Sequence, residues 1–246
     1  MNNKTIVVTG ASSGIGKETA RFLLDEGYRV VVTARNEEKL KEDFGSDENA
    51  LILPWDLSDV DQVIPYTKEV KELAGPISGF VHCAAAGINH LVSMIKPGLL
   101  ERHFDVNVYA AMLLTAGFAK KNMVTEDASF VLISSISAHA GTQGQAIYSA
   151  TKGALEGFIK GSAYELSQKG IRINAIAPGM VLTEPIKKQM QKIDEEGIRN
   201  IENSYPFGLG QPRDISNMIE FLFSDKSKWI TGQTFIVDGG FMIRKP

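Results

Sequence analysis

Residues 5–16 read TIVVTGASSGIG, an apolar run of β-branched residues that leads directly into a glycine-rich turn. The glycines let the chain turn tightly and let its backbone come close to a pyrophosphate. A helical pattern follows at 17–26, and the free N–H groups at the start of such a helix attract phosphate. This context predicts a dinucleotide site, the alternative being an ordinary strand-to-helix turn. Its residues are Gly10, Ser12, Ser13, Gly14, Ile15 and Gly16.

Short apolar runs of the same kind recur along the chain, separated by segments of helix length. After 5–9 they lie at 29–33, 50–53, 79–83, 130–133, 171–176 and 234–237. Most are apolar throughout, as strands buried on both faces need to be. Strands that alternate with helices form βαβ units in a parallel sheet. We therefore predict an α/β fold: one domain over residues 1–246, a doubly wound Rossmann-type sheet of seven parallel strands with helices on both faces.

The composition of the chain limits which partners and which cellular compartment are expected. The formal net charge is -3 with a pI near 5.9, so the chain lacks the basic surplus typical of nucleic-acid binding. No apolar run approaches the roughly 18 residues of a membrane span. A single cysteine, Cys83, excludes an internal disulfide and fits a reducing cytoplasm. We expect a cytoplasmic protein with no nucleic-acid or membrane partner.

The end of the second predicted strand bears on the choice of cofactor. An acidic residue there would bind the ribose 2′-hydroxyl of NAD, but this chain has Arg35. A guanidinium pairs well with a 2′-phosphate, so we predict a preference for NADP(H), with NAD(H) as the alternative. A solvated arginine is the other interpretation. Asp56, after the third strand, either accepts a hydrogen bond from the adenine amine or caps the next helix, where Ser58 competes.

Tyr148 and Lys152 are four residues apart and therefore share one face of a predicted helix. A nearby ammonium favours the phenolate and is expected to lower the tyrosine pKa from about 10 toward the working pH. Ser135, at the end of the fifth strand, is placed to hold a substrate oxygen. A tyrosine and lysine at this spacing often occur by chance, so the inference of acid–base chemistry depends on the joint pattern.

With these motifs, the chain resembles the short-chain dehydrogenase/reductase family over nearly its whole length. The resemblance rests on 9–16, Asp56-Leu57, Asn107 within DVNV, Ile133-Ser134-Ser135, Tyr148, Lys152 and the APGMVLT stretch at 177–183. It implies that Tyr148 is the general acid/base, that Lys152 assists it, and that Ser135 binds the substrate oxygen. It also implies that Asn107 supports a water relay to Lys152. Further cofactor contacts are implied at Leu57, Ala84, Ala85, Tyr148, Lys152, Pro178, Gly179, Val181 and Thr183, the last two at the nicotinamide carboxamide, and no metal is implied.

The implied function is interconversion of a ketone and a secondary alcohol by hydride transfer with NADP(H). The motifs after residue 205 resemble the subgroup of 3-oxoacyl-carrier-protein reductases, so an acyl thioester is one candidate substrate among small carbonyl and alcohol compounds. A catalytically silent nucleotide-binding regulator is an alternative, but such proteins usually lack part of the tyrosine, lysine and serine set. An epimerase or dehydratase of the extended type would carry a larger C-terminal domain.

Two helical segments, 99–118 and 153–166, carry apolar stripes wider than one sheet face requires. They are either well-buried helices or a subunit interface. Members of the family resembled commonly form oligomers, which favours the interface. We expect a homotetramer, with a dimer as the alternative.

One stretch departs from the family pattern. The sequence His82-Cys83-Ala84-Ala85 stands where the family usually has Asn-Asn-Ala-Gly, so an alanine replaces the glycine. This either tightens the floor under the adenosine ribose or shifts the loop. We interpret His82 and Cys83 as packing residues rather than metal ligands, because no companion ligands lie near them in the sequence. His139 either touches substrate or is an ordinary loop residue.

Segment 183–206 is poor in apolar residues, which fall three to five positions apart. That spacing suits a thin stripe on short helices. We predict a mobile helical lid that closes over the cofactor and brings Ile186, Met190 and Tyr205 toward the substrate. A rigid surface excursion is the alternative.

Overall fold

The computed structural model describes residues 4–87 and 89–243, which contain one sheet of seven strands in the order β3-β2-β1-β4-β5-β6-β7. All six pairings between neighbouring strands are parallel. The chain builds outward from β1 in one direction and then from β4 in the other, which places a switch point between these two strands. The predicted doubly wound parallel sheet is confirmed. The strands are β1 Thr5–Thr9, β2 Arg29–Thr33, β3 Ala50–Ile52, β4 Ile77–His82, β5 Val124–Ile133, β6 Arg172–Pro178 and β7 Thr234–Val237.

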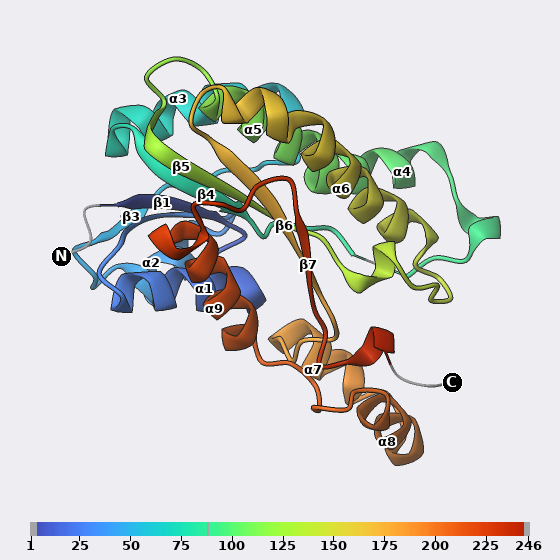
Figure 1. Cartoon of the computed structure of the whole chain (residues 1–246). Coiled ribbons are helices and arrows are strands. Elements are labelled where there is room, and N and C mark those ends of the chain that lie inside the picture. Colours follow the sequence, from blue (N-terminus) through green and yellow to red (C-terminus); the bar gives the residue numbers. More distant parts are fainter. Residues whose placement is uncertain (1–3, 88, 244–246) are drawn as a thin grey trace.

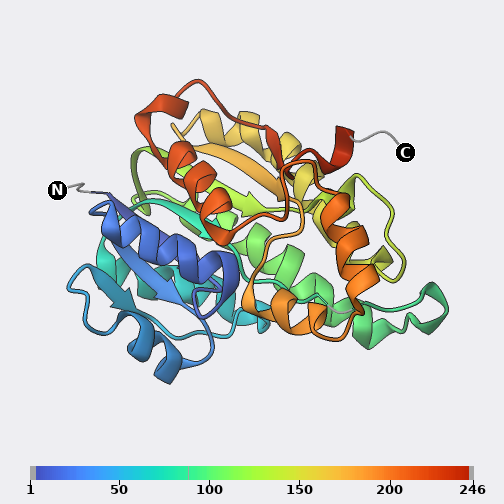
Figure 2. The same ribbon diagram turned by 90° about the horizontal axis from the view of Figure 1, so that it is seen from below.

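Helices cover both faces of the sheet. On one face lie α1 (Gly14–Asp25), α2 (Glu37–Phe44) and α9 (Pro212–Phe223), as Figure 1 and the view from below in Figure 2 show. On the other lie α3 (Val63–Ala74), α5 (Ala110–Phe118) and α6 (Ala146–Ser167), with α4 (Pro97–Phe104) at the end of this layer. None of the helices in the described residues is both long and apolar enough to cross a bilayer.

Each face of the sheet has its own apolar core, which explains why the strand sequences do not alternate. In β1, Ile6 and Val8 pack into one cluster and Val7 into the other, and all three are fully buried. Beneath α5, the ring of Phe80 lies 4.6 Å from that of Phe130 and 5.5 Å from that of Phe118, measured between centroids. Burying such a side chain contributes about 1.5–3 kcal/mol, so the continuous apolar runs are the main local determinant of the sheet.

Two elements differ from the boundaries that the sequence suggests. Strand β5 begins at Val124, six residues before the apolar run, because its first part is an exposed extension with a register shift against β4. The predicted helix at 99–118 consists of α4, a π-helical turn η3 (Asp105–Tyr109) and α5. The polar residues of the extension and the wider turn are both invisible to an apolar pattern.

The predicted lid segment is helical and projects beyond the end of the sheet, at the lower right of Figure 1. It contains α7 (Glu184–Met190) and α8 (Glu195–Asn203), neither of which has a buried residue. Tyr205 lies differently from the expectation. It is buried against Phe241, with 4.9 Å between ring centroids, and its hydroxyl accepts a hydrogen bond from the Met180 N–H at 3.0 Å. This residue therefore anchors the base of the segment.

Candidate active site

The glycine-rich turn after β1 is packed so closely that two of its glycines admit no side chain. A Cβ on Gly10, which has a φ of 68°, would lie 2.7 Å from the backbone nitrogen of Ala84. A Cβ on Gly16 would collide with the carbonyl oxygen of Gly10. These contacts fix the path of the chain from β1 into α1 and bring the start of that helix to the carboxyl edge of the sheet.

The start of α1 has the character of an anion site. The side chain of its N-cap residue, Ser13, makes no capping hydrogen bond, and the first turn holds no acidic residue. The N–H groups of that turn therefore face no carboxylate of their own helix, which suits the pyrophosphate of a dinucleotide. Thr183, far along the chain, closes over this turn: its Cγ2 would lie 3.1 Å from a Cβ on Gly14.

Arg35 and Asp56 lie near one another beyond the ends of β2 and β3, and both are exposed. Burial raises the pKa of the Asp56 carboxyl, but hydrogen bonds from Ser58 and the charge of Arg35 outweigh it, so the net shift is downward. Asp56 Oδ1 accepts from the Ser58 N–H at 3.0 Å and from its hydroxyl at 2.7 Å. Asp56 thus holds the turn before the next helix, whose N-cap is Asp59. The guanidinium of Arg35 remains exposed to solvent beside this turn.

The departure from the family pattern at Ala85 is accommodated without strain. Ala85 is exposed, and its φ is not among the positive values in the chain, so no glycine is needed there. The neighbouring Ala84 N–H donates to Thr9 Oγ1 at 3.3 Å. Leu57 is buried in the core, so its side chain is not exposed at the site.

Tyr148 and Lys152 lie on α6 beside the end of β5, where Ser135 begins the turn η4 (Ile136–Ala138). The Lys152 side chain is buried, with Nζ 5.4 Å from the centroid of the Tyr148 ring and 2.6 Å from the carbonyl oxygen of Ile133. Tyr148 hydrogen-bonds with Ser135. The structure therefore brings the three predicted catalytic residues together, although the tyrosine lies 13 positions after the serine.

Burial dominates the protonation of these groups. It raises the pKa of the Tyr148 phenol, and the hydrogen bond with Ser135 only partly opposes that effect. This direction is opposite to the expectation from the sequence, because removal of the phenol from water is the larger of the two effects. Burial also lowers the pKa of Lys152 to about 8, while the Cys83 thiol acts in the other direction. At neutral pH the phenol is protonated and the lysine is charged.

Asn107 lies in the π-helical turn η3 and is fully buried. Its Oδ1 accepts the Ala86 N–H at 2.7 Å, and its Nδ2 donates to the Ala86 carbonyl and to Thr151 Oγ1, both at 3.0 Å. The side-chain amide is thus fully used by the backbone of Ala86 and by the hydroxyl of Thr151, the residue before Lys152.

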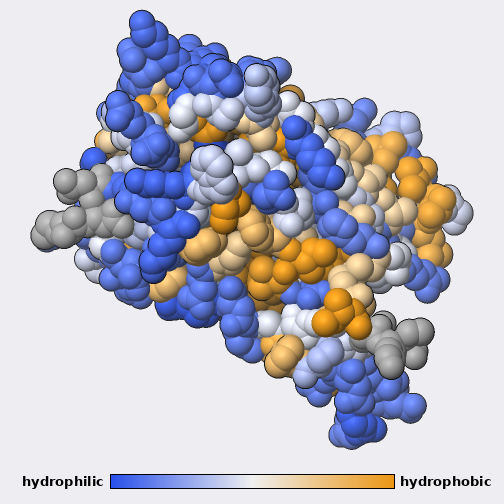
Figure 3. Space-filling view, in the orientation of Figure 1, coloured by the Kyte–Doolittle hydropathy of each residue, from blue (hydrophilic) through white to orange (hydrophobic). Residues whose placement is uncertain are grey.

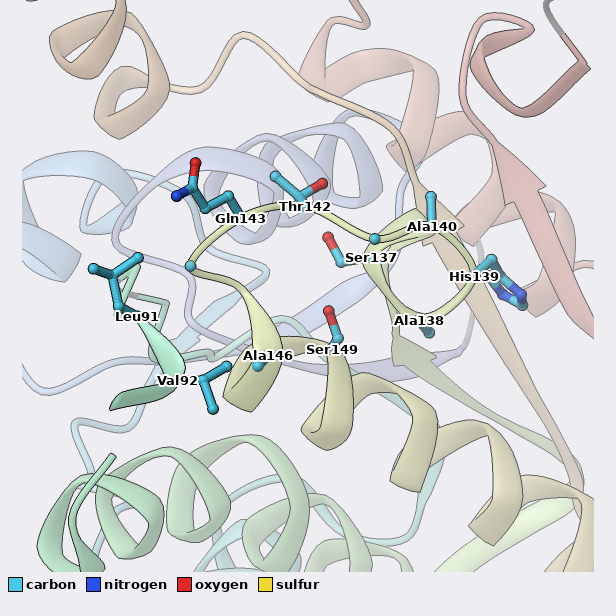
Figure 4. A pocket seen from close by; sticks show the side chains of 12 residues that line it. Leu91, Val92, Ser137, Ala138, His139, Ala140, Thr142, Gln143, Ala146 and Ser149 are labelled. Atoms are coloured by element: carbon cyan, nitrogen blue, oxygen red, sulfur yellow. The ribbon is translucent and has the colours of Figure 1, made fainter. Parts of the chain in front are cut away.

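A second polar network near the serine was not predicted. Glu156, one helical turn after Lys152, is buried, and its Oε1 accepts from Ser134 Oγ at 2.6 Å. The same oxygen lies 3.0 Å from His139 Nε2. His139 therefore binds this carboxylate, and Figure 4 shows its side chain pointing away from the pocket. The sequence offers one signal for this network, because Glu156 is an acidic residue on the apolar face of a predicted helix.

A pocket of about 490 Å³ opens beside these residues. Leu91 and Val92 form one wall, residues 137–144 form the other, and Ser137 and Ser149 direct their hydroxyls into it (Figure 4). Ser137 joins the pocket to Ser135, because Ser135 Oγ donates to Ser137 Oγ at 3.1 Å. His139 is the one titratable residue of this lining, and it already binds Glu156.

The segment after β6 completes the edge of the site. Gly179 N–H donates to the carbonyl of Val237 at 2.9 Å, and Val181 forms an isolated bridge with Gly210. These contacts carry the chain from Pro178, the last residue of β6, to Thr183, which lies against Gly14. The predicted nicotinamide contacts thus approach the phosphate-binding turn. The described residues contain no group of three or more His, Cys, Asp or Glu side chains fit to hold a metal ion.

Comparison with known proteins assigns this chain to a family. Residues 10–242 match the family described as "Enoyl-(Acyl carrier protein) reductase". The 3-oxoacyl-[acyl-carrier-protein] reductase FabG of Rickettsia bellii (strain RML369-C) is 33% identical over 248 residues, covering 99% of this chain and 98% of that one. This chain belongs to the short-chain dehydrogenase/reductase family. Within it, the chain is similar to the FabG reductases.

Two solved structures support the same assignment. "ElxO with NADP Bound" matches with a TM-score of 0.87 at 28% identity, covering 98% of this chain and 100% of that one. "4-hydroxyisoleucine dehydrogenase complexed with NADH" matches with a TM-score of 0.91 at 27% identity, covering 99% and 100%. This short-chain dehydrogenase/reductase is thus an oxidoreductase of alcohol and carbonyl groups that uses a nicotinamide cofactor.

Proposed function

We propose that this enzyme interconverts a ketone and a secondary alcohol with NADP(H), and that Tyr148 is its general acid/base. The observation that carries the proposal is the meeting of Tyr148, Lys152 and Ser135 at the carboxyl edge of the sheet. A silent regulator has no need of this arrangement, and its completeness favours an enzyme.

Each residue has a role that follows from its surroundings. A bound nicotinamide supplies the hydride. Ser135 holds the carbonyl oxygen, and the protonated phenol of Tyr148 gives that oxygen its proton as negative charge develops on it. The charge of Lys152 offsets the phenolate that remains, because its Nζ lies only 5.4 Å from the ring centroid. The backbone around Asn107 holds the path by which Lys152 regains a proton from water.

The preference for NADP(H) rests on Arg35. Its exposed guanidinium stands beyond β2, where a carboxylate would bind the ribose 2′-hydroxyl of NAD, and it makes no ion pair with another described side chain. A 2′-phosphate at this place would receive a bidentate, charge-assisted contact. The similar structures with NADP and with NADH bound leave NAD(H) as the alternative.

The substrate is proposed to be a small carbonyl or alcohol compound, with a 3-oxoacyl thioester as the leading candidate. The FabG relatives act on a substrate carried by acyl carrier protein, as their names state. At the pocket, Leu91 and Val92 have exposed side chains, and Figure 3 shows apolar colouring at the right edge where this segment lies. Such a wall suits an uncharged acyl chain better than a charged sugar.

We further propose a homotetramer in the cytoplasm. Helix α6 carries Gly153, Gly157 and Gly161 at four-residue spacing, and a Cβ on any of them would meet no atom within 4 Å apart from the adjoining residues and backbone of its own helix. This open strip lets another helix approach closely, and two tyrosine rings are exposed as well, Tyr164 on α6 and Tyr109 at the end of η3. A reducing compartment suits the single thiol of Cys83.

The experiment that tests the proposed function is Tyr148→Phe. NADPH oxidation is followed with ketones, aldoses, a 3-oxoacyl thioester and an enoyl thioester as substrates. Both thioesters are included because the family is named for reduction of an enoyl C=C bond and the relatives for reduction of a 3-oxo C=O bond. The variant is expected to bind NADPH normally by fluorescence and to lose about three or more orders of magnitude in kcat, because the ring stays and the proton donor is removed. Near-normal turnover on the substrate of the wild type refutes the assignment.

A further inference from the structure

His82, at the end of β4, is buried and uses both ring nitrogens in hydrogen bonds. Its Nε2 lies 2.9 Å from the carbonyl oxygen of Val106, and its Nδ1 lies 3.0 Å from Thr9 Oγ1. A carbonyl oxygen can only accept, so Nε2 carries the proton and Nδ1 is the acceptor. The Thr9 hydroxyl therefore donates to Nδ1, and Thr9 Oγ1 accepts from the Ala84 N–H at 3.3 Å. These contacts assign every proton in the chain of hydrogen bonds.

The ring keeps this form at working pH. Burial lowers the pKa of His82 to about 4; the hydrogen bond to Val106 opposes the shift, and the charge of Lys152 adds to it. A neutral ring with a fixed tautomer is a rigid link between three segments, because it cannot exchange donor and acceptor without breaking one of its hydrogen bonds.

The contact with Val106 lies at the one turn of the helix that departs from α geometry. In η3 the Ala110 N–H donates to the Asp105 carbonyl, five residues back. In an α-helix that donor would belong to Val106. In the wider turn, the carbonyl of Val106 therefore receives no hydrogen bond from the Ala110 N–H. The ring of His82 supplies a donor in its place. The next residue is Asn107, whose side chain is fixed between Ala86 and Thr151. Insertions of this kind are frequent at functional sites.

We propose that His82 is a positioning residue: its Nε2–H holds the π-helical turn and so places Asn107 for proton transfer at Tyr148 and Lys152. This inference rests on the proposed function, since it concerns the same proton path. Through Thr9, which precedes Gly10, the same ring also ties the phosphate-binding turn to the catalytic helix layer. A histidine at this position thereby couples the two halves of the site.

Two variants separate the two hydrogen bonds of the ring. His82→Gln places an amide N–H near the position of Nε2 and keeps the donor to Val106. His82→Asn places an acceptor near the position of Nδ1, keeps the contact with Thr9, and removes the donor to Val106. Both are assayed with NADPH and the acetoacetyl thioester of N-acetylcysteamine, with thermal unfolding as the measure of stability.

We expect His82→Asn to lose about tenfold to hundredfold in kcat, because a small misplacement of catalytic groups has effects of this size. The KM for NADPH should stay close to that of the wild type, and the pH profile of kcat should move. His82→Gln should restore most of kcat. Equal kcat in the two variants, or losses of kcat that only follow the losses of stability, overturn the proposal.

A measurement on the wild type does not depend on the variants folding. The ¹⁵N resonances of the His82 ring are expected to report a neutral Nε2–H tautomer at neutral pH, and an Nδ1–H tautomer or a charged ring overturns the proposal. Tyr148→Phe keeps the two ideas apart. If that variant retains turnover, the proposed function fails; if it loses turnover while His82→Asn keeps it, only the positioning role fails.

Discussion

Replacing Lys152 by methionine should abolish turnover without lowering the stability of the fold at neutral pH. The Lys152 side chain is buried, and burial lowers the pKa of its ammonium from 10.5 to about 8. Each pH unit between these values corresponds to about 1.4 kcal/mol, so the charged form costs the folded state about 3 kcal/mol at pH 7. Methionine has similar length and no charge.

The loss of one hydrogen bond offsets part of the stability gained by removing the buried charge. The Lys152 Nζ donates to the Ile133 carbonyl at 2.6 Å, and leaving a buried acceptor without its donor costs about 1–3 kcal/mol. Lys152→Met is therefore expected to equal the wild type in free energy of unfolding at pH 7, or to exceed it by up to about 2 kcal/mol. The lysine thus serves catalysis at a cost in stability.

The dependence on pH identifies the cause. Because the folded pKa of Lys152 lies below its unfolded value, the unfolded wild type binds an extra proton between about pH 8 and 10.5. The free energy of unfolding of the wild type must therefore rise, relative to that of the variant, by about 3 kcal/mol as pH increases through this window. Above the window the variant is the less stable protein, because only the lost contact with Ile133 remains.

Urea unfolding at intervals from pH 7 to above the window measures the difference between the two proteins. Lys160→Met is the matched control, since Lys160 lies on the same helix and is exposed. That control should differ from the wild type by a nearly constant amount across the window. A difference between the wild type and Lys152→Met that stays flat over the same range contradicts the reasoning.

Three further predictions concern cofactor, lid and assembly. Arg35→Asp should raise the Kd for NADPH about tenfold to hundredfold and bring NADH closer, because a charge-assisted contact contributes about 1.5–3 kcal/mol; equal kcat/KM for both cofactors in the wild type contradicts this. Amides at 184–205 should exchange quickly in the free enzyme and slow down with NADPH, since α7 and α8 have no buried residue; high protection without cofactor would favour a rigid excursion. Light scattering at micromolar concentration should give the mass of a tetramer, and a monomer mass would exclude the interface on α6.

Much of the fold follows from local features of the sequence. The apolar run at 5–9 and its six counterparts predict seven buried strands, because a strand covered on both faces must be apolar at every position. The turn at 10–16 predicts its own shape, since steric contact admits only glycine at Gly10 and Gly16. The spacing of Tyr148 and Lys152 places both on one helix face by helix geometry alone.

The tertiary structure decided the features that join distant parts of the chain. The link from His82 to Val106, the Ser134–Glu156–His139 network and the placement of Tyr205 under Met180 all join residues at least 17 positions apart. Which groups meet across such separations depends on strand order and register, and no local pattern encodes these. The sign of the Tyr148 pKa shift is of the same kind. The neighbouring lysine argued for a lower value, but desolvation sums over side chains from several elements, so only the packed structure shows that burial prevails.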